Sequence, residues 1–308
     1  MINTCPFFGI CGGCKFDFAS PDYRAKKLSE LGDLPITDDA IWFAPGGRRR
    51  ADFAFAPDAF GFYMAHSKNI VPVRHCPLLM DEINKILPQI AELPWGGAGS
   101  CLVTVCDNGV DVAITSTVPY FTTEFKHSAE KTDAIRITWN GRDVVRRATP
   151  TVNFDGHVVE YPAGAFLQPT LASEQTLRNM VVESARGARH TADLFCGLGN
   201  FTFALNADGF DIAGIGTTRD LFTHPLTVGM LNGYDCVVMD PPRAGARAQC
   251  EQLARSTTGR VIYVSCNPAT WRRDCAILTR GGYKMTRLIP VDQFVASAHW
   301  ELFSVFER

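Results

Sequence analysis

The sequence has no long apolar run and no strong excess of either charge. No apolar segment approaches the roughly 18 residues that a membrane span requires, and the first residues lack the basic stretch that opens a secretory signal. Lysine and arginine number 30 against 32 aspartate and glutamate, for a formal net charge of −2. No general basic field therefore draws the chain onto nucleic acid, and such a contact would need a local patch. We expect a cytoplasmic protein without a membrane partner.

Low-complexity segments are also lacking. The 26 glycines and 18 prolines are scattered, 46% of the residues are hydrophobic and 20% are charged. This composition excludes a largely disordered, collagen-like or coiled-coil protein. A length of 308 residues exceeds the usual size of one domain, so one large domain or two moderate ones are expected.

Cysteine, by contrast, is abundant. The chain has eleven, and an odd number excludes a complete disulfide framework within one chain, which favours metal-binding or catalytic roles. Cys5, Cys11 and Cys14 crowd together, with two glycines between the last two that permit a tight loop. Cys76, followed by a proline as Cys5 is, is the candidate for a fourth ligand. Four thiolates suit zinc or an iron–sulfur cluster, and the spacing does not choose between them. Reduced cysteines without a metal are the alternative.

Hydrophobic patterning divides the chain into two halves. Residues 1–160 predict a β-rich domain with helices over 23–31 and 80–93 and strands over 41–55, 60–73, 101–115 and 135–145. Residues 161–308 predict an α/β domain with a helix over 166–184, buried parallel strands over 192–195, 235–240 and 260–265, and two last strands over 284–291 and 299–307. The basic run Arg48-Arg49-Arg50 indicates either a solvated loop or a phosphate contact.

The ends of the three buried strands carry polar residues that suit a ligand site. Gly197-Leu198-Gly199 follows the first strand and permits close approach of a nucleotide-like ligand. Thr202 stands where a dinucleotide fingerprint has its third glycine, which favours a nucleoside without pyrophosphate; a tight structural turn is the alternative. Asp240 ends the second strand and Cys266 follows the third, so both lie at the carboxyl edge, where ligands bind. An inert buried thiol is the other interpretation of Cys266.

The last strand adds a carboxylate to this edge. If it runs antiparallel to the others, its start lies beside their carboxyl ends, and Glu301 would meet Cys266. A nucleophilic thiol and a carboxylate beside a nucleoside pocket are the groups needed for carbon methylation of a pyrimidine. An ordinary surface glutamate is the alternative.

The chain resembles the 5-methyluridine RNA methyltransferases, especially the iron–sulfur branch that modifies 23S ribosomal RNA. The resemblance spans nearly the whole chain and rests on short motifs: Cys5-Pro-Phe-Phe-Gly-Ile-Cys-Gly-Gly-Cys14, His75-Cys-Pro-Leu78, Phe166-Leu-Gln168, Asp193-Leu-Phe-Cys-Gly-Leu-Gly-Asn200, Arg219-Asp-Leu-Phe222, Asp240-Pro-Pro-Arg-Ala-Gly245, Ser265-Cys-Asn-Pro268, Asp292-Gln-Phe294 and His299-Trp-Glu301.

This resemblance implies a Rossmann-like S-adenosylmethionine methyltransferase domain, preceded by an RNA-binding α+β domain with an iron–sulfur loop. Cys266 is then the nucleophile and Glu301 the base. The implied S-adenosylmethionine-binding residues are Gln168, Phe195, Asn200, Asp220 and Asp240. A [4Fe–4S] cluster is implied on Cys5, Cys11, Cys14 and Cys76. The implied partner is 23S ribosomal RNA, and we expect a monomer.

One segment departs from the family pattern. Between Asn200 and Asp240 the family has two strand–helix units, whereas this segment is too short, and its strand-like piece 210–216 ends without an acid for the cofactor ribose. Either about 25 residues are missing from the chain or part of the pocket is lost. The second possibility favours an RNA-binding iron–sulfur protein that no longer methylates. Methylation of an adenine amino group is disfavoured, because Arg243 replaces the expected aromatic residue and Cys266 would have no role.

Overall fold

The computed structural model describes residues 5–308, which form two compact units built from interleaved stretches of chain. The first unit comprises the residues up to Lys27, Ala44–Leu171 and Val295–Ala298; the second comprises Leu28–Phe43, Ala172–Phe294 and His299–Arg308. The sequence predicted domains over 1–160 and 161–308. Residues 28–43 instead join the second unit, because a strand at Ile41–Trp42 pairs with the sheet of that unit.

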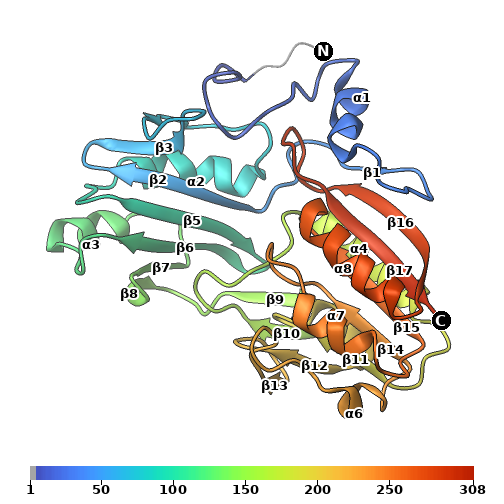
Figure 1. Ribbon diagram of the computed structural model, residues 1–308. Helices are drawn as coiled ribbons and strands as arrows, with labels where there is room; N and C mark the ends of the chain where they lie inside the picture. Colours follow the sequence, from blue (N-terminus) through green and yellow to red (C-terminus); the bar gives the residue numbers. More distant parts are fainter. Residues whose placement is uncertain (1–4) are drawn as a thin grey trace. The chain divides into compact units, whose positions relative to one another are not determined.

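The first unit is built on a seven-stranded sheet in the order β4-β3-β2-β5-β6-β7-β8 (Figure 1). Its strands are β2 (Arg50–Ala56), β3 (Ala59–Tyr63), β4 (Ile70–Val71), β5 (Gly99–Cys106), β6 (Gly109–Ser116), β7 (Arg136–Trp139) and β8 (Arg142–Arg146). A separate hairpin consists of β9 (Thr151–Phe154) and β10 (His157–Glu160). The helices are α1 (Tyr23–Leu28), α2 (Asp81–Ala91) and α3 (Thr123–Ala129). The 3-10 turn at Ser29–Leu31 that follows α1 already belongs to the second unit.

The core of the first unit lies between the sheet and α2. Ile83, Ile86, Leu87 and Ile90 follow the spacing of one helix face, and all four are buried in one cluster with sheet residues such as Phe53. This packing explains why the apolar pattern predicted the helix within a few residues of its observed bounds.

The basic run Arg48-Arg49-Arg50 holds the backbone together rather than forming a solvated loop. Arg49 is only 1% exposed, and its Nε donates to the carbonyl oxygen of Gln168 at 3.1 Å. Arg48 Nε donates to the carbonyl oxygen of Arg50 at 2.9 Å, and Arg50 Nη2 donates to that of Gly164 at 3.3 Å. Backbone carbonyl oxygens therefore already accept hydrogen bonds from these three guanidinium groups, which a phosphate contact would need as donors.

The second unit contains an eight-stranded sheet in the order β1-β16-β17-β15-β14-β11-β12-β13. Its strands are β1 (Ile41–Trp42), β11 (Thr191–Leu194), β12 (Asp208–Asp211), β13 (Thr217–Thr218), β14 (Cys236–Met239), β15 (Arg260–Ser265), β16 (Lys284–Asp292) and β17 (Glu301–Glu307). Strand β17 runs antiparallel to both of its neighbours, and the other pairs in this sheet are parallel. The predicted direction of the last strand is therefore confirmed.

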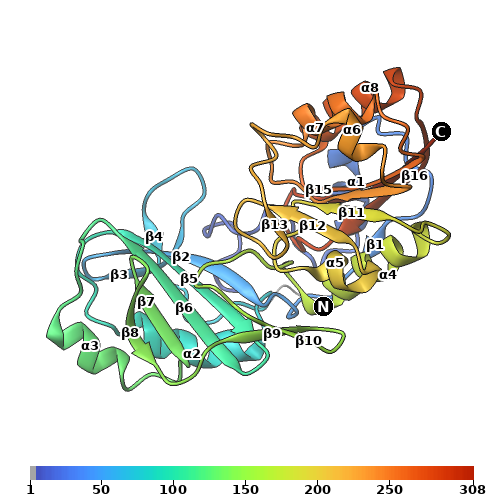
Figure 2. The ribbon, with the colours of Figure 1, turned by 90° about the horizontal axis from the view of Figure 1, so that it is seen from below.

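Helices cover both faces of this second sheet (Figure 2). They are α4 (Leu171–Ser184) and α5 (Asn200–Leu205) on one face, and α6 (Val228–Leu231), α7 (Arg247–Leu253) and α8 (Pro268–Arg280) on the other. Alternate residues of β14 contribute to the two cores: Val237 packs in the cluster with α7 and α8, and Val238 in the cluster with α4. Both faces are buried, as the continuous apolar strands predicted. Across residues 5–308, no helix has the length and apolarity needed to cross a bilayer.

The short segment after α5 differs from the prediction. The strand covers Asp208–Asp211 and does end in an acid, so the prediction of a strand over 210–216 without one is wrong. Residues 212–216 then turn directly into β13, which pairs with β12 in parallel. A parallel connection ordinarily needs about a dozen residues or more. The structure therefore has only a short turn at the place where the sequence indicated that a crossover is missing.

Candidate active site

Cys266 and Glu301 lie opposite each other at the carboxyl edge of the second sheet. Strands β15 and β17 pair with Ser265 facing Leu302, and the next position outward in this register is Cys266 facing Glu301. Burial, together with the charges of Glu301 and Asp240, raises the pKa of Cys266 to about 12. The structure thus brings together three of the side chains that the sequence selected.

Glu301 has the surroundings of a proton acceptor held in a dry site. Its side chain is 3% exposed, and Gln293 Nε2 donates to Oε2 at 2.5 Å, whereas Oε1 has no hydrogen-bond partner. Burial raises the pKa of Glu301 well above its ordinary value, and the nearby Asp240 charge adds to this shift. A carboxylate with a raised pKa is a stronger base, and its unpaired oxygen is available to a bound ligand.

Cys266 is positioned by the start of α8. Asn267 caps this helix by accepting from Ala269 N at 3.1 Å and donates from Nδ2 to the carbonyl oxygen of Arg243 at 2.9 Å. The helix N-terminus and the Arg243 charge favour a thiolate, whereas burial and two carboxylates favour the thiol. Because the pKa of Cys266 is raised, burial and the two carboxylates outweigh the helix N-terminus and Arg243. Cys266 is therefore protonated at neutral pH until it reacts.

This balance predicts a specific pH dependence for Cys266 alkylation. With a pKa of about 12, we expect slow reaction with iodoacetamide near pH 8 and a rise of about tenfold per pH unit up to about pH 10. Glu301→Gln should accelerate the reaction at pH values where Glu301 is ionised, because it then removes a charge that raises the thiol pKa. Peptide mass mapping would follow Cys266 separately from the other cysteines. The variant Glu307→Gln, at the other end of the same strand, is the control; equal rates in both variants would contradict this electrostatic picture.

The glycine turn after β11 contains side-chain atoms left for a ligand. Phe195, Gly197 and Gly199 all have positive φ, at 63°, 52° and 94°, so the turn is tightly coiled and strained at Phe195. Asn200 begins α5 with both amide atoms buried and without a hydrogen-bond partner. Buried polar atoms are ordinarily paired, so an external ligand is the natural partner for this amide.

Two aspartates lie near this turn, and the sequence prediction selected only one of them. Asp211 Oδ2 accepts from Gly197 N at 3.0 Å; the prediction missed it because the apolar residues after it resemble a continuing strand. The predicted residue, Asp220, follows β13 in a turn, where its carboxylate accepts from Phe222 N at 3.0 Å. The centroids of the Phe222 and Phe195 rings are 5.4 Å apart, so this turn lies beside the glycine turn.

The chain itself covers part of the glycine turn. Ile215 N donates to the carbonyl oxygen of Gly197 at 2.9 Å, and a Cβ at Gly199 would lie 2.3 Å from Ile215 Cδ1. A Cβ at Gly214 would lie 2.3 Å from the same Gly197 oxygen. The connection 212–216 is therefore packed against the backbone that a nucleoside ligand would approach.

The remaining predicted residues belong to the first unit. Gln168 is buried, with its carbonyl oxygen bonded to Arg49. Cys5, Cys11, Cys14 and Cys76 are half-buried, and none of them is in a disulfide. Burial, together with the charges of Cys76, Cys11 and Cys5, raises the pKa of Cys14 to about 12. Within residues 5–308, however, no three histidine, cysteine or acidic side chains have the arrangement of a metal site.

Part of the chain matches a known family, and nearly the whole chain matches a solved structure. Residues 224–308 match the family described as tRNA (Uracil-5-)-methyltransferase, a segment that includes Asp240, Cys266 and Glu301. The chain resembles a tRNA (uracil-54, C5)-methyltransferase of Pyrococcus abyssi, solved with S-adenosyl-L-homocysteine, with a TM-score of 0.72 and 20% identity over 92% of this chain and 82% of that one. This likeness shows the fold.

Relatives in sequence cover nearly the whole chain. An uncharacterized RNA methyltransferase of Agrobacterium fabrum is 34% identical over 344 residues, covering 97% of this chain and 83% of the relative. The alignment exceeds the 308 residues of this chain, so the relative has segments that this chain lacks. The 23S rRNA (uracil(1939)-C(5))-methyltransferase of Klebsiella pneumoniae is 29% identical, covering 99% and 81%. The chain belongs to the RNA methyltransferase family shared by these relatives, and its residues 224–308 match the tRNA (Uracil-5-)-methyltransferase model.

Proposed function

We propose that this protein methylates C5 of a uridine in 23S ribosomal RNA, with Cys266 as nucleophile and Glu301 as base. The observation that carries the proposal is the meeting of a half-buried thiol and a buried carboxylate with one unpaired oxygen at the same sheet edge. The 23S target is favoured by the Klebsiella relative, whose name states that substrate. A cytoplasmic monomer remains our prediction.

The proposed chemistry follows from the two side chains. The Cys266 proton passes to water as the sulfur bonds to C6 of the uracil ring, and the C5–C6 π electrons move onto the C4 carbonyl as an enolate. The enolate re-forms its carbonyl as C5 takes the methyl group from S-adenosylmethionine, whose C–S bond to that methyl breaks to release S-adenosylhomocysteine. Glu301 then accepts the C5 proton. The electrons of that C–H bond restore the C5–C6 double bond and expel the Cys266 thiolate. The target base must leave its stack to reach this site.

S-adenosylmethionine, as substrate, would supply an electrophilic methyl group. The unpaired amide of Asn200 fits its polar groups, and Phe195 and Asp220 lie at the same turn. Asp240 beside Glu301 would complete the pocket within the second unit, and Gln168 stays a proposed cofactor-binding residue on the strength of the resemblance. Asp211 joins this set, because it ends the strand where the family pattern places the ribose-binding acid. To bind a ribose, its carboxylate would exchange the bond to Gly197 for the ligand.

We also propose a [4Fe–4S] cluster on Cys5, Cys11, Cys14 and Cys76. The chemistry of the donors fits, because soft thiolates suit such a cluster and neighbouring thiols raise the pKa values of Cys11, Cys14 and Cys76. The described thiols do not have the closed arrangement of a metal site, so the loop would have to close around the cluster. The backbone at Cys76 is held in place, because Asn84 Oδ1 accepts from the Cys76 backbone N–H at 2.9 Å.

Anaerobically purified protein should be brown, with broad absorbance in the visible region and about four iron atoms per chain. Cys14→Ser should lose this colour, whereas Cys101→Ser, in the core of the first unit, should keep it if the variant folds. A colourless, zinc-containing protein would refute the cluster and leave the methylation proposal standing.

A second function is favoured by the connection 212–216 on the glycine turn. If this segment prevents binding of S-adenosylmethionine, the protein would bind RNA without methylating it. Calorimetry with S-adenosylmethionine separates the two functions, because the enzyme requires binding by the folded protein.

The methylation proposal itself is tested by incubating the protein with unmodified 23S ribosomal RNA and the methyl donor and mapping 5-methyluridine by mass. No 5-methyluridine at any position would refute it.

A further inference from the structure

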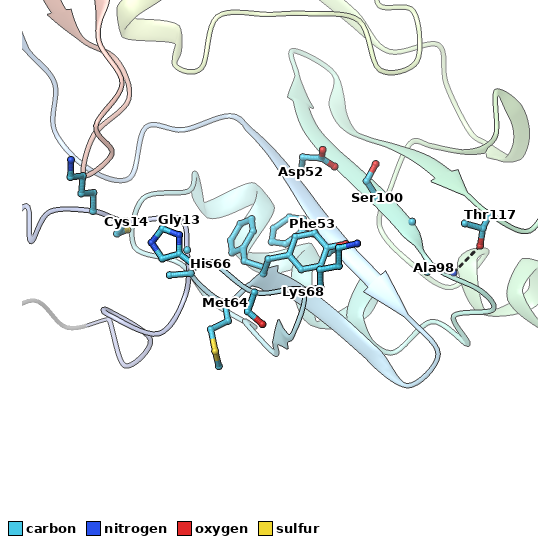
Figure 3. Close-up of a pocket in the computed structure, with 18 residues that line it drawn as sticks. Gly13, Cys14, Asp52, Phe53, Met64, His66, Lys68, Ala98, Ser100 and Thr117 are labelled. Carbon is cyan, nitrogen blue, oxygen red and sulfur yellow. Dashed lines mark hydrogen bonds between the residues drawn. The ribbon is translucent and has the colours of Figure 1, made fainter. Parts of the chain in front are cut away.

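A large groove opens on one face of the sheet of the first unit. Its volume is about 1450 Å³, larger than the roughly 300–1,000 Å³ of pockets that hold small molecules. Phe53 of β2, Phe62 of β3 and Ser100 of β5 line its floor, while residues 12–15 and 63–68 form its walls. Figure 3 shows the groove extending from Cys14 and His66 toward Ala98 and Thr117. An extended ligand therefore suits this groove better than a compact one.

The cysteine loop and the 63–68 loop are joined in one wall. Gly12 N donates to the carbonyl oxygen of Tyr63 at 2.9 Å, and Ala65 N donates to that of Ile10 at 3.2 Å. Gly12 is closely fitted, since an added Cβ would lie 3.1 Å from the Tyr63 oxygen. These contacts fix the backbone that carries the exposed side chains of the groove.

An exposed aromatic ring in the groove offers a flat surface for stacking. The Tyr63 side chain is 49% exposed, whereas the neighbouring Phe62 stacks on Phe53, with ring centroids 4.5 Å apart, against the buried core and supports the strand. Unpaired bases of single-stranded RNA stack on such rings without strong sequence preference. The floor thus has a feature that a phosphate-binding surface alone would not need.

The charges of the groove complement a nucleic acid. Lys15 and Lys68 are exposed along it, in a chain whose net charge is −2. Asp52 is the one carboxylate among its described lining residues, and a carboxylate can accept from the amino group of a base. Cations beside exposed rings favour RNA over an acidic or apolar peptide segment.

We propose that this groove binds a single-stranded segment of the RNA substrate. Tyr63 stacks on a base, Lys15 and Lys68 neutralise phosphates, and the cysteine loop holds the Tyr63 backbone in place. This inference rests on the proposed function in one respect, namely that the substrate is RNA. It assigns binding to residues of the first unit and does not depend on methyl transfer.

The test is a fluorescence titration of a labelled oligouridylate of about ten nucleotides, performed without a methyl donor. Tyr63→Ala should raise Kd about tenfold, and Tyr63→Phe should restore binding because it keeps the ring. Lys15→Ala and Lys68→Ala should each reduce the dependence of log Kd on log salt by about 0.7. The controls are Tyr120→Ala and Lys131→Ala. Both residues are exposed and lie outside the groove, and Tyr120 is 63% exposed.

The outcomes separate this inference from the proposed function. Groove variants that bind the oligouridylate as tightly as the two controls would overturn the inference, as would wild-type protein that does not bind it; a peptide partner for the groove would give one of these results. Weakened binding in the groove variants, together with wild-type protein that never forms 5-methyluridine, would support the inference and refute methylation alone.

Discussion

Cys266→Ala should lower the rate of uridine methylation by at least about 10⁴-fold, because no other group can form the bond to C6. RNA binding should change little, since the substitution removes one sulfur atom from a half-buried position. The measurement is single-turnover transfer of a labelled methyl group to ribosomal RNA, with RNA affinity measured on the same sample.

The matched control for this substitution is Cys275→Ala. Cys275 is also half-buried and lies on α8, the helix that follows Cys266, but it is not at the carboxyl edge of the sheet. Its variant should methylate at nearly the wild-type rate. Retained methylation by Cys266→Ala would eliminate the covalent route.

Glu301→Gln should accumulate a covalent protein–RNA adduct while turnover falls by about 10²–10⁴-fold. Glutamine has a similar shape but cannot accept the C5 proton, so the thiol stays attached to C6. The adduct would migrate slowly in a denaturing gel and would require both RNA and the methyl donor.

The control for the adduct is Glu307→Gln, a change on the same strand at a carboxylate paired with Arg260. It should form no adduct. Loss of activity in Glu301→Gln without an adduct would argue that Glu301 acts before the methyl transfer, or only in holding the fold.

The carboxyl edge was predictable because its signals are local. Apolar runs ending at polar residues predicted the three parallel strands, and the observed β15 has the same bounds as its prediction. The direction of the last strand then followed from its place in the sheet, and with it the approach of Glu301 to Cys266.

Other features have no local signal. Strand β1 has two residues and is fixed by pairing with β16, some 250 positions later in the chain, so its unit could not be predicted from its own sequence. The end of β12 at Asp211 was hidden because Ile212 and Ile215 resemble a continuing strand, whereas glycines fold them back onto the turn. The groove likewise needs separate loops that only the folded sheet brings together.

The most direct measurement of the covalent mechanism uses RNA that contains 5-fluorouridine at the target position. Fluorine cannot leave C5 as a proton does, so the reaction should stop with the ring still bonded to sulfur. Digestion and mass spectrometry should find the methylated, fluorinated uracil on the peptide that contains Cys266, in an amount approaching one per protein chain. A stable complex carried by another cysteine, or methyl transfer without any covalent complex, would contradict the mechanism.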